Sequence, residues 1–344
     1  MATKIDIKKG DKILISRSDK LGDLILALPF VETMKKRYPE CDIDVLTSLY
    51  ASPIIENNNH IRKIIRVQND QLFKDNLYKK DLLQKLKKEN YSVVVVLYPE
   101  RYISRLFYKA NIPIRIGTAR RFNSVFYNHF IYHSRKENKK HEYQYNLDFL
   151  KLFLDGETVT QPNIYLRDKE IKNARRILKE ANVSNDFILI HPGSGGSAES
   201  WPMVKFMELS EHLKSRNYEV VFSGSDSESE MIKKISAQMK FDIKSIAGET
   251  DLRTLGAVLS LANVVVANST GPLHLAAALN TKVVGLYPSR KIMSPVRWGP
   301  IGDNHKVIMP SIKECQCPSD NCKCMEQISE ESLCEEIIAS FSGN

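Results

Sequence analysis

The sequence alternates short apolar runs with amphipathic segments, and it does so in two successive series. In the first series, the runs KILIS, DIDVLTS and IRKIIRV are each followed by turn or helix-like residues, and YSVVVVLYP holds four consecutive valines. Continuous apolar runs of this length are typical of strands buried on both faces of a parallel sheet. Strands that alternate with helices predict an α/β fold built on a doubly wound sheet.

The second series repeats this pattern after a charged and then turn-rich crossing that contains Gly156 and Pro162. A chain of 344 residues exceeds what one core usually holds, so we expect two Rossmann-like domains, residues 1–160 and 161–344. Ligands of open α/β sheets bind at the carboxyl ends of the strands, and two such domains can face a shared cleft. The expected strands of the second series are FILIHPG, YEVVFSG, IKSIAG, VVVAN and KVVGLYP.

Composition narrows the function classes. No apolar run approaches the length of a membrane span, and the N-terminus lacks the apolar core of a signal peptide, so we expect a cytoplasmic protein. The formal net charge of +9 favours acidic partners such as nucleic acid, an anionic membrane or a phosphorylated small molecule. No stacking-aromatic or recognition-helix motif supports a nucleic-acid partner.

Three loops of the second half combine small and hydroxyl residues with a following helix. Such loops present backbone N–H groups and a positive dipole end to an anion, although tight turns and ordinary caps produce similar patterns. His274 is either part of this site or a satisfied buried histidine. Three such loops in one domain favour a nucleotide site. The candidate residues are Ser194, Gly195, Gly196, Ser197, Ser223, Gly224, Ser269, Thr270, Gly271 and His274.

The only comparable loop of the first half is GDLILALP, where Asp23 stands at the start of a helix-like run. A carboxylate at this place either caps the helix or acts as a general base. The local chain physics alone favours the cap.

Several segments, in their order along the chain, resemble glycosyltransferase family 9, the ADP-heptose:lipopolysaccharide heptosyltransferases. The similarity extends almost from end to end. The segments that carry it are ISRSDKLGDLILALPFVETMKKRYP, IPIRIGTARR, HEYQYNLDFL, HPGSGGSAESWPMVKF, STGPLHLAAAL, RWGP and CQCPSDNCKCMEQIS.

The resemblance implies a GT-B fold and an inverting, metal-independent transfer of heptose from an ADP-linked donor to a lipopolysaccharide core acceptor. It implies no cofactor, and it implies that Asp23 is the catalytic base. The alternatives are another nucleotide sugar, a protein or other glycan acceptor, or a non-catalytic nucleotide-binding module.

Two positions depart from the family pattern. Many members carry a lysine where this chain has Glu199, and an aspartate where it has Ser269. A glutamate has the wrong charge for binding a diphosphate. We expect Arg290, Lys291 or Arg297 to supply the missing positive charge, with Arg297 as the candidate donor-binding residue.

Arginines cluster in sequence near the later elements of the first half. Their forked guanidinium groups suit the phosphates and carboxylates of an anionic glycolipid acceptor, although a solvated basic face is equally compatible with them. A basic face would also hold the enzyme at the inner face of the membrane. These candidates are Arg101, Arg105, Arg115, Arg120 and Arg121.

The cysteines do not suggest a secreted disulfide scaffold, since five of six lie in the last thirty residues. Cys315, Cys317, Cys322 and Cys324 form a C-x-C-x4-C-x-C pattern. Thiolate sets bind zinc or iron, although structural zinc sites more often use C-x2-C pairs. Because the tail resembles that of the family and the resemblance implies no metal role for it, we expect free thiols or a local loop motif and no metal site.

Overall fold

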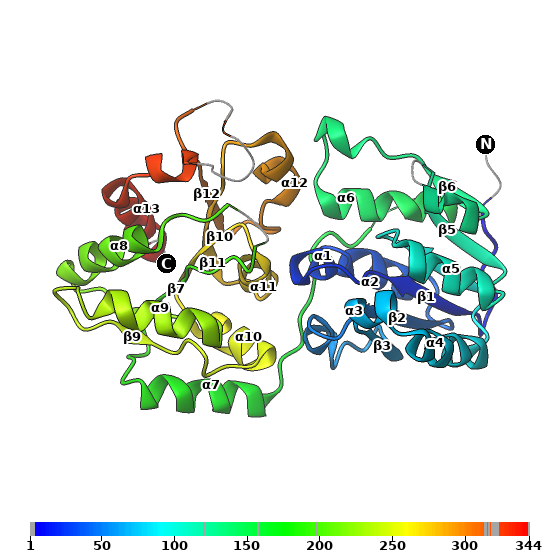
Figure 1. Ribbon diagram of the computed structural model, residues 1–344, viewed down its shortest axis with the longest axis horizontal. Coiled ribbons are helices and arrows are strands. Elements are labelled where there is room, and N and C mark those ends of the chain that lie inside the picture. Colours follow the sequence, from blue (N-terminus) through cyan, green and yellow to red (C-terminus); the bar gives the residue numbers. More distant parts are fainter. Residues whose placement is uncertain are drawn as a thin grey trace. The chain divides into compact units, whose positions relative to one another are not determined.

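The computed structural model describes residues 4–119, 122–156, 158–196, 199–312, 315, 317 and 323–342. The chain divides into two compact units, Met1–Tyr165 and Leu166–Asn344, and each contains its own six-stranded sheet (Figure 1). All recorded strand pairs are parallel. The predicted α/β fold of two doubly wound domains is therefore confirmed. No helix in the described part of the chain is long and apolar enough to cross a membrane.

The sheet of the first unit has the order β3-β2-β1-β4-β5-β6. The chain moves outward from β1 to β3, returns, and then moves outward on the other side from β4 to β6. β1 and β4 are therefore neighbours at the point where the direction reverses. The strands are β1 (Lys12–Ser16), β2 (Asp42–Ser48), β3 (Lys63–Val67), β4 (Val93–Val96), β5 (Ile114–Thr118) and β6 (His129–Ile131).

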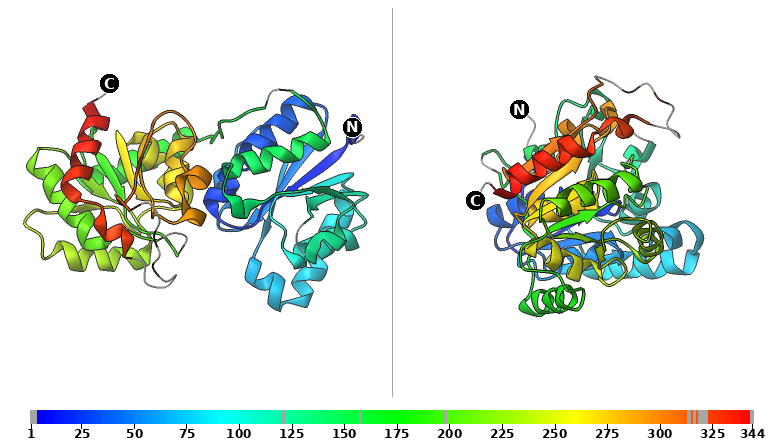
Figure 2. Two further views of the ribbon diagram at one scale, coloured as in Figure 1. Left: turned by 90° about the horizontal axis from the view of Figure 1, so that it is seen from above. Right: turned by 90° about the vertical axis from the view of Figure 1, so that its left-hand side faces the viewer.

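Helices cover this sheet, as two views show (Figure 1, Figure 2). Leu72, Leu86 and Phe107, from three successive helices, share one buried core with Leu14 and Val94 of the central strands. In the same unit, α2 and α6 also pack against each other. The helices are α1 (Leu21–Ile25), α2 (Leu28–Arg37), α3 (Asn69–Lys74), α4 (Asn76–Glu89), α5 (Arg101–Lys109) and α6 (Glu142–Leu147), with a 3-10 turn η3 (Arg135–Glu137) before α6.

The first helical region is not one continuous helix. It consists of α1 and α2, which are separated at Leu26 and Ala27. Pro29 lies in the first turn of α2, where its missing N–H costs no helical hydrogen bond, so a second helix begins there. The short α1 is thus a separate element that follows the loop after β1 and carries Asp23.

The second unit repeats the topology of the first, with the strand order β12-β11-β10-β7-β8-β9. β7 and β10 are the neighbours at which the direction reverses. The strands are β7 (Ile188–His191), β8 (Val220–Phe222), β9 (Lys244–Ser245), β10 (Val264–Asn268), β11 (Lys282–Leu286) and β12 (His305–Ile308).

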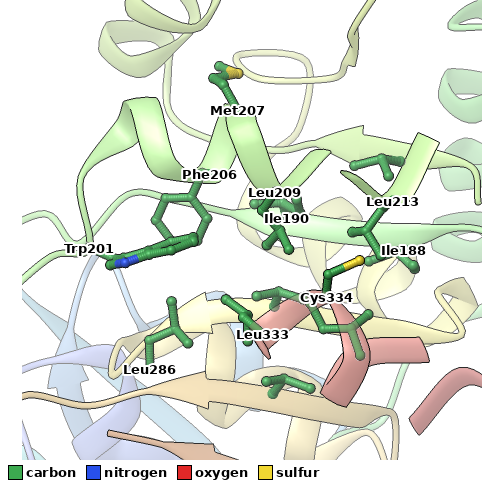
Figure 3. Packing of buried hydrophobic residues seen from close by; sticks show 14 of the residues in the cluster. Ile188, Ile190, Trp201, Phe206, Met207, Leu209, Leu213, Leu286, Leu333 and Cys334 are labelled. Carbon is green, nitrogen blue, oxygen red and sulfur yellow. The ribbon is translucent and has the colours of Figure 1, made fainter. Parts of the chain in front are cut away.

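A large apolar core joins one face of this sheet to α8, α9 and α13 (Figure 3). Trp201, which is 1% exposed, stacks edge-to-face on Phe206 at 4.9 Å between ring centroids. Leu333 and Cys334 bring the C-terminal helix into the same core. The helices are α7 (Asp168–Glu180), α8 (Met203–Ser215), α9 (Asp226–Ser236), α10 (Leu252–Leu261), α11 (Gly271–Ala278), α12 (Pro295–Trp298) and α13 (Glu330–Ser342).

Candidate functional site

The expected site residues lie at the reversal point of the sheet in each unit. Loops that leave neighbouring strands in opposite directions open a crevice at the carboxyl ends of those strands. Asp23 follows β1 in the first unit. In the second unit, Ser194 follows β7 and Ser269 follows β10. In each unit, the candidate residues therefore lie at the edge of the sheet where open α/β sheets bind their ligands.

Asp23 is the third residue of α1 and does not cap it. The N-cap residue is Lys20, which makes no side-chain cap hydrogen bond. One oxygen of Asp23, Oδ1, instead accepts a hydrogen bond from Nη2 of Arg17. The Asp23 side chain is 14% exposed, so the carboxylate is paired but still reaches the surface.

Arg17 is the centre of a buried polar cluster. It is 2% exposed, and its Nε donates to Oδ1 of Asp19 at 2.8 Å. Its Nη1 donates to Glu142 at 3.3 Å and to Asn146 at 3.2 Å. Burial alone would lower the pKa of Arg17, but the surrounding carboxylates raise it, so Arg17 stays charged.

The pKa of Asp19 is also raised, but for a different reason. Burial raises the pKa of Asp19 to about 7, although the charge of Arg17 acts to lower it. The neighbouring negative charge of Asp23 adds to the increase. Near neutral pH, Asp19 therefore holds a proton more readily than an ordinary aspartic acid does.

Sequence reasoning missed most of this cluster. The polar run RSD directly after β1 was an available signal for Arg17 and Asp19, because polar side chains after a central strand lie at the ligand edge of the sheet. Glu142 lies 125 positions from Arg17 in the chain, and no local pattern connects the two.

The loop after β7 has the backbone expected of an anion-binding turn. Gly195 and Gly196 have positive φ angles of 51° and 68°, a region that favours glycine, and their missing side chains face open space. Ser194 precedes them and is partly exposed, whereas Ser197 lies outside the described residues. α8 begins after Pro202 without a side-chain cap.

The loop after β10 leads into α11 in a similar way. Thr270 is the N-cap residue, but its hydroxyl donates to the carbonyl of Asn268 at 3.1 Å and does not cap the helix. Ser269 is partly exposed, Gly271 is the first helical residue, and His274 is 5% exposed in the first turn. α8 and α11 therefore both begin without a hydrogen bond from a capping side chain.

One side chain that the sequence did not single out holds these two loops together. Asn268 is fully buried at the end of β10. Its Oδ1 accepts from the N–H of Trp201 at 3.0 Å, and its Nδ2 donates to the carbonyl of Pro192 at 2.7 Å. The start of α8 and the loop after β7 are thus fixed to β10.

The loop after β8 is held by contacts with the end of β7 and with the start of α9. Ser223 is buried, and its hydroxyl lies 3.0 Å from Nδ1 of His191. Burial lowers the pKa of His191 to about 4, so its ring is neutral at pH 7. Ser225 and Glu228 form a capping box at the start of α9. A side chain at Gly224 would meet the Glu228 carboxylate at 3.0 Å, so this glycine permits the close approach of Glu228.

Glu199 and Arg290 form an ion pair, with Nη1 3.4 Å from Oε1. The unexpected negative charge of Glu199 is therefore already matched by a cation from the loop after β11. Arg290 also donates from Nη2 to the carbonyl of Cys317 at 2.8 Å. Arg297 lies on α12 with its guanidinium 4.5 Å from the centre of the Trp298 ring.

The arginines expected to bind an acceptor occupy different environments. Arg101 and Arg105 are exposed on α5. Arg115 on β5 uses its guanidinium to hold the carbonyls of Ile112 and Phe126, at 2.5 and 2.8 Å, which is a structural role. Arg120 and Arg121 lie outside the described residues.

The cysteines of the tail are described only in part, because Cys322 lies outside the described residues. The N–H of Cys317 donates to Sγ of Cys315 at 3.4 Å, and Cys324 is buried. Among the described residues, no group of three or more His, Cys, Asp or Glu side chains is arranged to hold a metal ion.

A surface depression lined by residues such as Lys214, Tyr218 and Lys244 lies beside the starts of β8 and β9. This is the edge of the sheet opposite the candidate residues. Parallel α/β sheets bind ligands at the carboxyl edge, so the depression is not part of the candidate site.

Known proteins resemble the chain over most of its length. Residues 80–328 match the sequence model of glycosyltransferase family 9 (heptosyltransferase). A Haemophilus influenzae protein that is described only as a glycosyltransferase, with no named substrate, is 28% identical to this chain over 320 residues. The match covers 89% of this chain and 91% of that protein. Lipopolysaccharide heptosyltransferase 3 of Escherichia coli is 24% identical over 291 residues, which cover 82% of this chain and 84% of that protein.

A solved structure shows the same fold. It is that of the E. coli heptosyltransferase WaaC with ADP, which matches with a TM-score of 0.75 at 19% sequence identity. The match covers 96% of this chain and 99% of the WaaC chain. Both units thus have counterparts in that protein.

Proposed function

The chain belongs to glycosyltransferase family 9, and from that premise we propose that this glycosyltransferase moves heptose from an ADP-heptose donor to the inner core of lipopolysaccharide, with inversion. The observation that carries the proposal is the position of Asp23. Its carboxylate follows β1 at the reversal point of the first sheet, is held by a buried arginine and stays partly exposed.

Asp23 is the general base of the proposed reaction. It accepts the proton of the acceptor hydroxyl as that oxygen forms a bond to the anomeric carbon of the donor. The bond from this carbon to the diphosphate oxygen breaks, and ADP leaves with the electron pair. One attack from the face opposite the leaving group inverts the configuration, so one carboxylate suffices for the proton transfer.

The second unit binds the donor in this proposal. The starts of α8 and α11 have no side-chain cap, which leaves backbone N–H groups and a positive dipole end for the diphosphate. These donors also stabilise the charge that develops on the leaving ADP. WaaC, a protein of the same fold, was solved with ADP, which supports an adenine nucleotide here as well.

The domain roles follow from this assignment. Residues 1–160 are the acceptor domain and residues 161–344 the nucleotide-sugar domain. We propose that transfer requires no metal ion, because the helix starts and Arg297 supply the positive charge at the leaving group. Full activity in the presence of EDTA would support this point, and activity restored only by an added divalent cation would contradict it.

We also propose that the first unit binds the anionic membrane that contains the acceptor. Arg101 and Arg105 are exposed on α5, which also carries Tyr102. The half-exposed rings of Tyr102 and Phe73 meet edge-to-face, with their centroids 4.7 Å apart. Basic and aromatic side chains together suit an anionic lipid surface. The protein should sediment with anionic vesicles and not with zwitterionic ones, and Arg101→Glu/Arg105→Glu should abolish the difference.

Mass spectrometry after incubation with ADP-heptose and truncated core acceptors tests the proposed function. We expect one acceptor to gain the mass of a single heptose residue, with stoichiometric release of ADP. An enzyme that transfers nothing to any core acceptor and releases no ADP would contradict the proposal, and transfer from a different nucleotide sugar would correct the donor.

A further inference from the structure

One buried guanidinium has all of its nitrogen atoms engaged at the reversal point of the first sheet. In Arg17, Nε binds Asp19, Nη1 binds Glu142 and Asn146, and Nη2 binds Asp23. A planar guanidinium fixes its partners in direction as well as in distance, which a lysine ammonium does not. Arg17 is therefore suited to orient carboxylates.

We propose that Arg17 is the positioning residue for Asp23, and that the contacts of its other nitrogens with α6 and Asp19 hold it in place. The inference rests on the proposed function, in which Asp23 is the base. Arg17 is 2% exposed, and it acts through Asp23.

The contact between the two residues leaves one carboxylate oxygen for the chemistry. Arg17 binds Oδ1 of Asp23, and no other hydrogen bond from a described residue reaches this carboxylate. Oδ2 therefore accepts the proton of the acceptor hydroxyl. A carboxylate fixed through one oxygen keeps the other in a constant direction, and small errors in such a direction lower rates strongly.

Arg17 is itself fixed from α6. Glu142 and Asn146 stand one turn apart on this helix and both bind Nη1. Nη2 of Arg135 donates at 3.1 Å to Oε1 of Glu142, the same oxygen that Arg17 binds, and Nδ2 of Asn146 donates to the carbonyl of Leu26 at 2.9 Å. The segment that ends α1 and the side chain that orients Asp23 are therefore tied to the same helix.

The charges of the cluster explain why arginine is needed here. Two cations, Arg17 and Arg135, face the carboxylates of Asp19, Asp23 and Glu142, and the Tyr98 ring lies 5.8 Å from the Arg17 guanidinium. Removal of the Arg17 charge would leave three carboxylates with one cation. Protons would then bind the cluster more readily, and the base would be lost at a higher pH.

Two substitutions of Arg17 distinguish the effect of its fork geometry on Asp23 from the effect of its positive charge. Arg17→Lys keeps the charge but not the fork, so we expect kcat to fall about ten-fold or more while KM for the donor stays within about two-fold. Arg17→Gln removes the charge, so we also expect the acidic limb of the kcat profile to move up by about one pH unit. Arg62→Lys is the matched control, because Arg62 holds Asp44 and Glu89 at the opposite edge of the same sheet. Its kcat should stay within about two-fold of wild type.

Circular dichroism and thermal denaturation show which variants are folded. If Arg17→Gln does not fold, the inference is tested on folded Arg17→Lys alone, which should show a lower kcat at an unchanged KM for the donor. Wild-type kcat and an unmoved acidic limb in the folded variants would overturn the inference. A loss of activity that matches the loss of folded protein at every pH would do the same.

Asp23→Asn in the same assay distinguishes the proposal that Asp23 is the base from the proposal that Arg17 positions it. If Asp23→Asn loses transfer and the Arg17 variants do not, the inference about Arg17 alone is wrong. If Asp23→Asn transfers at the wild-type rate, the base assignment is wrong. If the wild type transfers nothing, the proposed function is contradicted, and the inference falls with it.

Discussion

Nη1 of Arg290 lies 3.4 Å from Oε1 of Glu199, so the loops after β11 and β7 are joined by an ion pair at the carboxyl edge of the second sheet. The side chains of both residues are largely buried, with exposed fractions of 12% and 21%. A glutamate beside a proposed diphosphate site is thus neutralised by a partner from another loop.

The pair predicts that substitutions of Glu199 and Arg290 have non-additive effects on donor binding in a double-mutant cycle. Arg290→Gln leaves the negative charge of Glu199 unmatched, so we expect the affinity for ADP to fall by about ten-fold, or 1.4 kcal/mol. Glu199→Gln/Arg290→Gln should regain most of the affinity, because both charges are removed together. Isothermal titration of the four proteins measures the coupling. Strictly additive effects would show that the pair does not shield the donor.

Arg297 is the second cation that we expect near the leaving group. Arg297→Ala should weaken ADP binding by at least about ten-fold, since a charge-assisted hydrogen bond to phosphate is lost. Arg175→Ala, on the exposed face of α7, is the matched control and should leave the affinity unchanged. An affinity of Arg297→Ala equal to that of the control would rule out this role.

A buried pair joins α7 to α10 and predicts a large stability effect. Arg253 holds both oxygens of Glu170, at 2.9 and 2.5 Å. Burial raises the pKa of Glu170, but the bonds to Arg253 outweigh it and lower the pKa overall. Arg253→Met leaves this carboxylate buried without its cation and should cost about 3–5 kcal/mol in the free energy of unfolding.

Urea denaturation gives these free energies. Arg253→Met/Glu170→Leu should recover more than half of the loss, because no unpaired charge remains. Arg176→Met breaks the exposed pair with Glu180 and should cost less than about 1 kcal/mol. Equal costs for Arg253→Met and Arg176→Met would contradict the importance of burial.

Asp19 predicts a pH dependence of stability. Burial raises its pKa to about 7 from an ordinary value of 3.8, so the folded protein binds more protons than the unfolded chain between these values. Its contribution to stability is complete below about pH 4 and is lost as the pH rises toward 7. Asp19→Asn mimics the neutral form, so between pH 4 and 8 it should remove a decline on the order of 4 kcal/mol. Parallel pH profiles for the two proteins would contradict this account.

The sequence predicts the fold well where strands are central. The bounds of β1, β2 and β10 coincide with the predicted runs KILIS, DIDVLTS and VVVAN, because almost every residue of these strands is buried. β6 and β12 went unpredicted. They are edge strands that expose Phe130, His305 and Lys306, so burial does not impose a pattern on their sequences.

The site is predictable only in its local parts. Asp23 and Thr270 follow strands, and a pattern within a few residues marks them. Contacts between distant segments leave no such mark. The pairing of Arg17 with Glu142 and that of Glu199 with Arg290 depend on which loops the topology brings together. The strand order, which places β4 beside β1 and β10 beside β7, is likewise invisible in any single segment.

The central claim is that Asp23 accepts the proton of the acceptor as heptose is transferred. Its most direct test is the single-turnover rate of transfer by Asp23→Asn beside the wild type, with ADP-heptose bound to both at saturation. We predict a rate about 10²–10⁴-fold lower for Asp23→Asn, with donor affinity within about two-fold of wild type. A rate equal to that of the wild type would contradict the account.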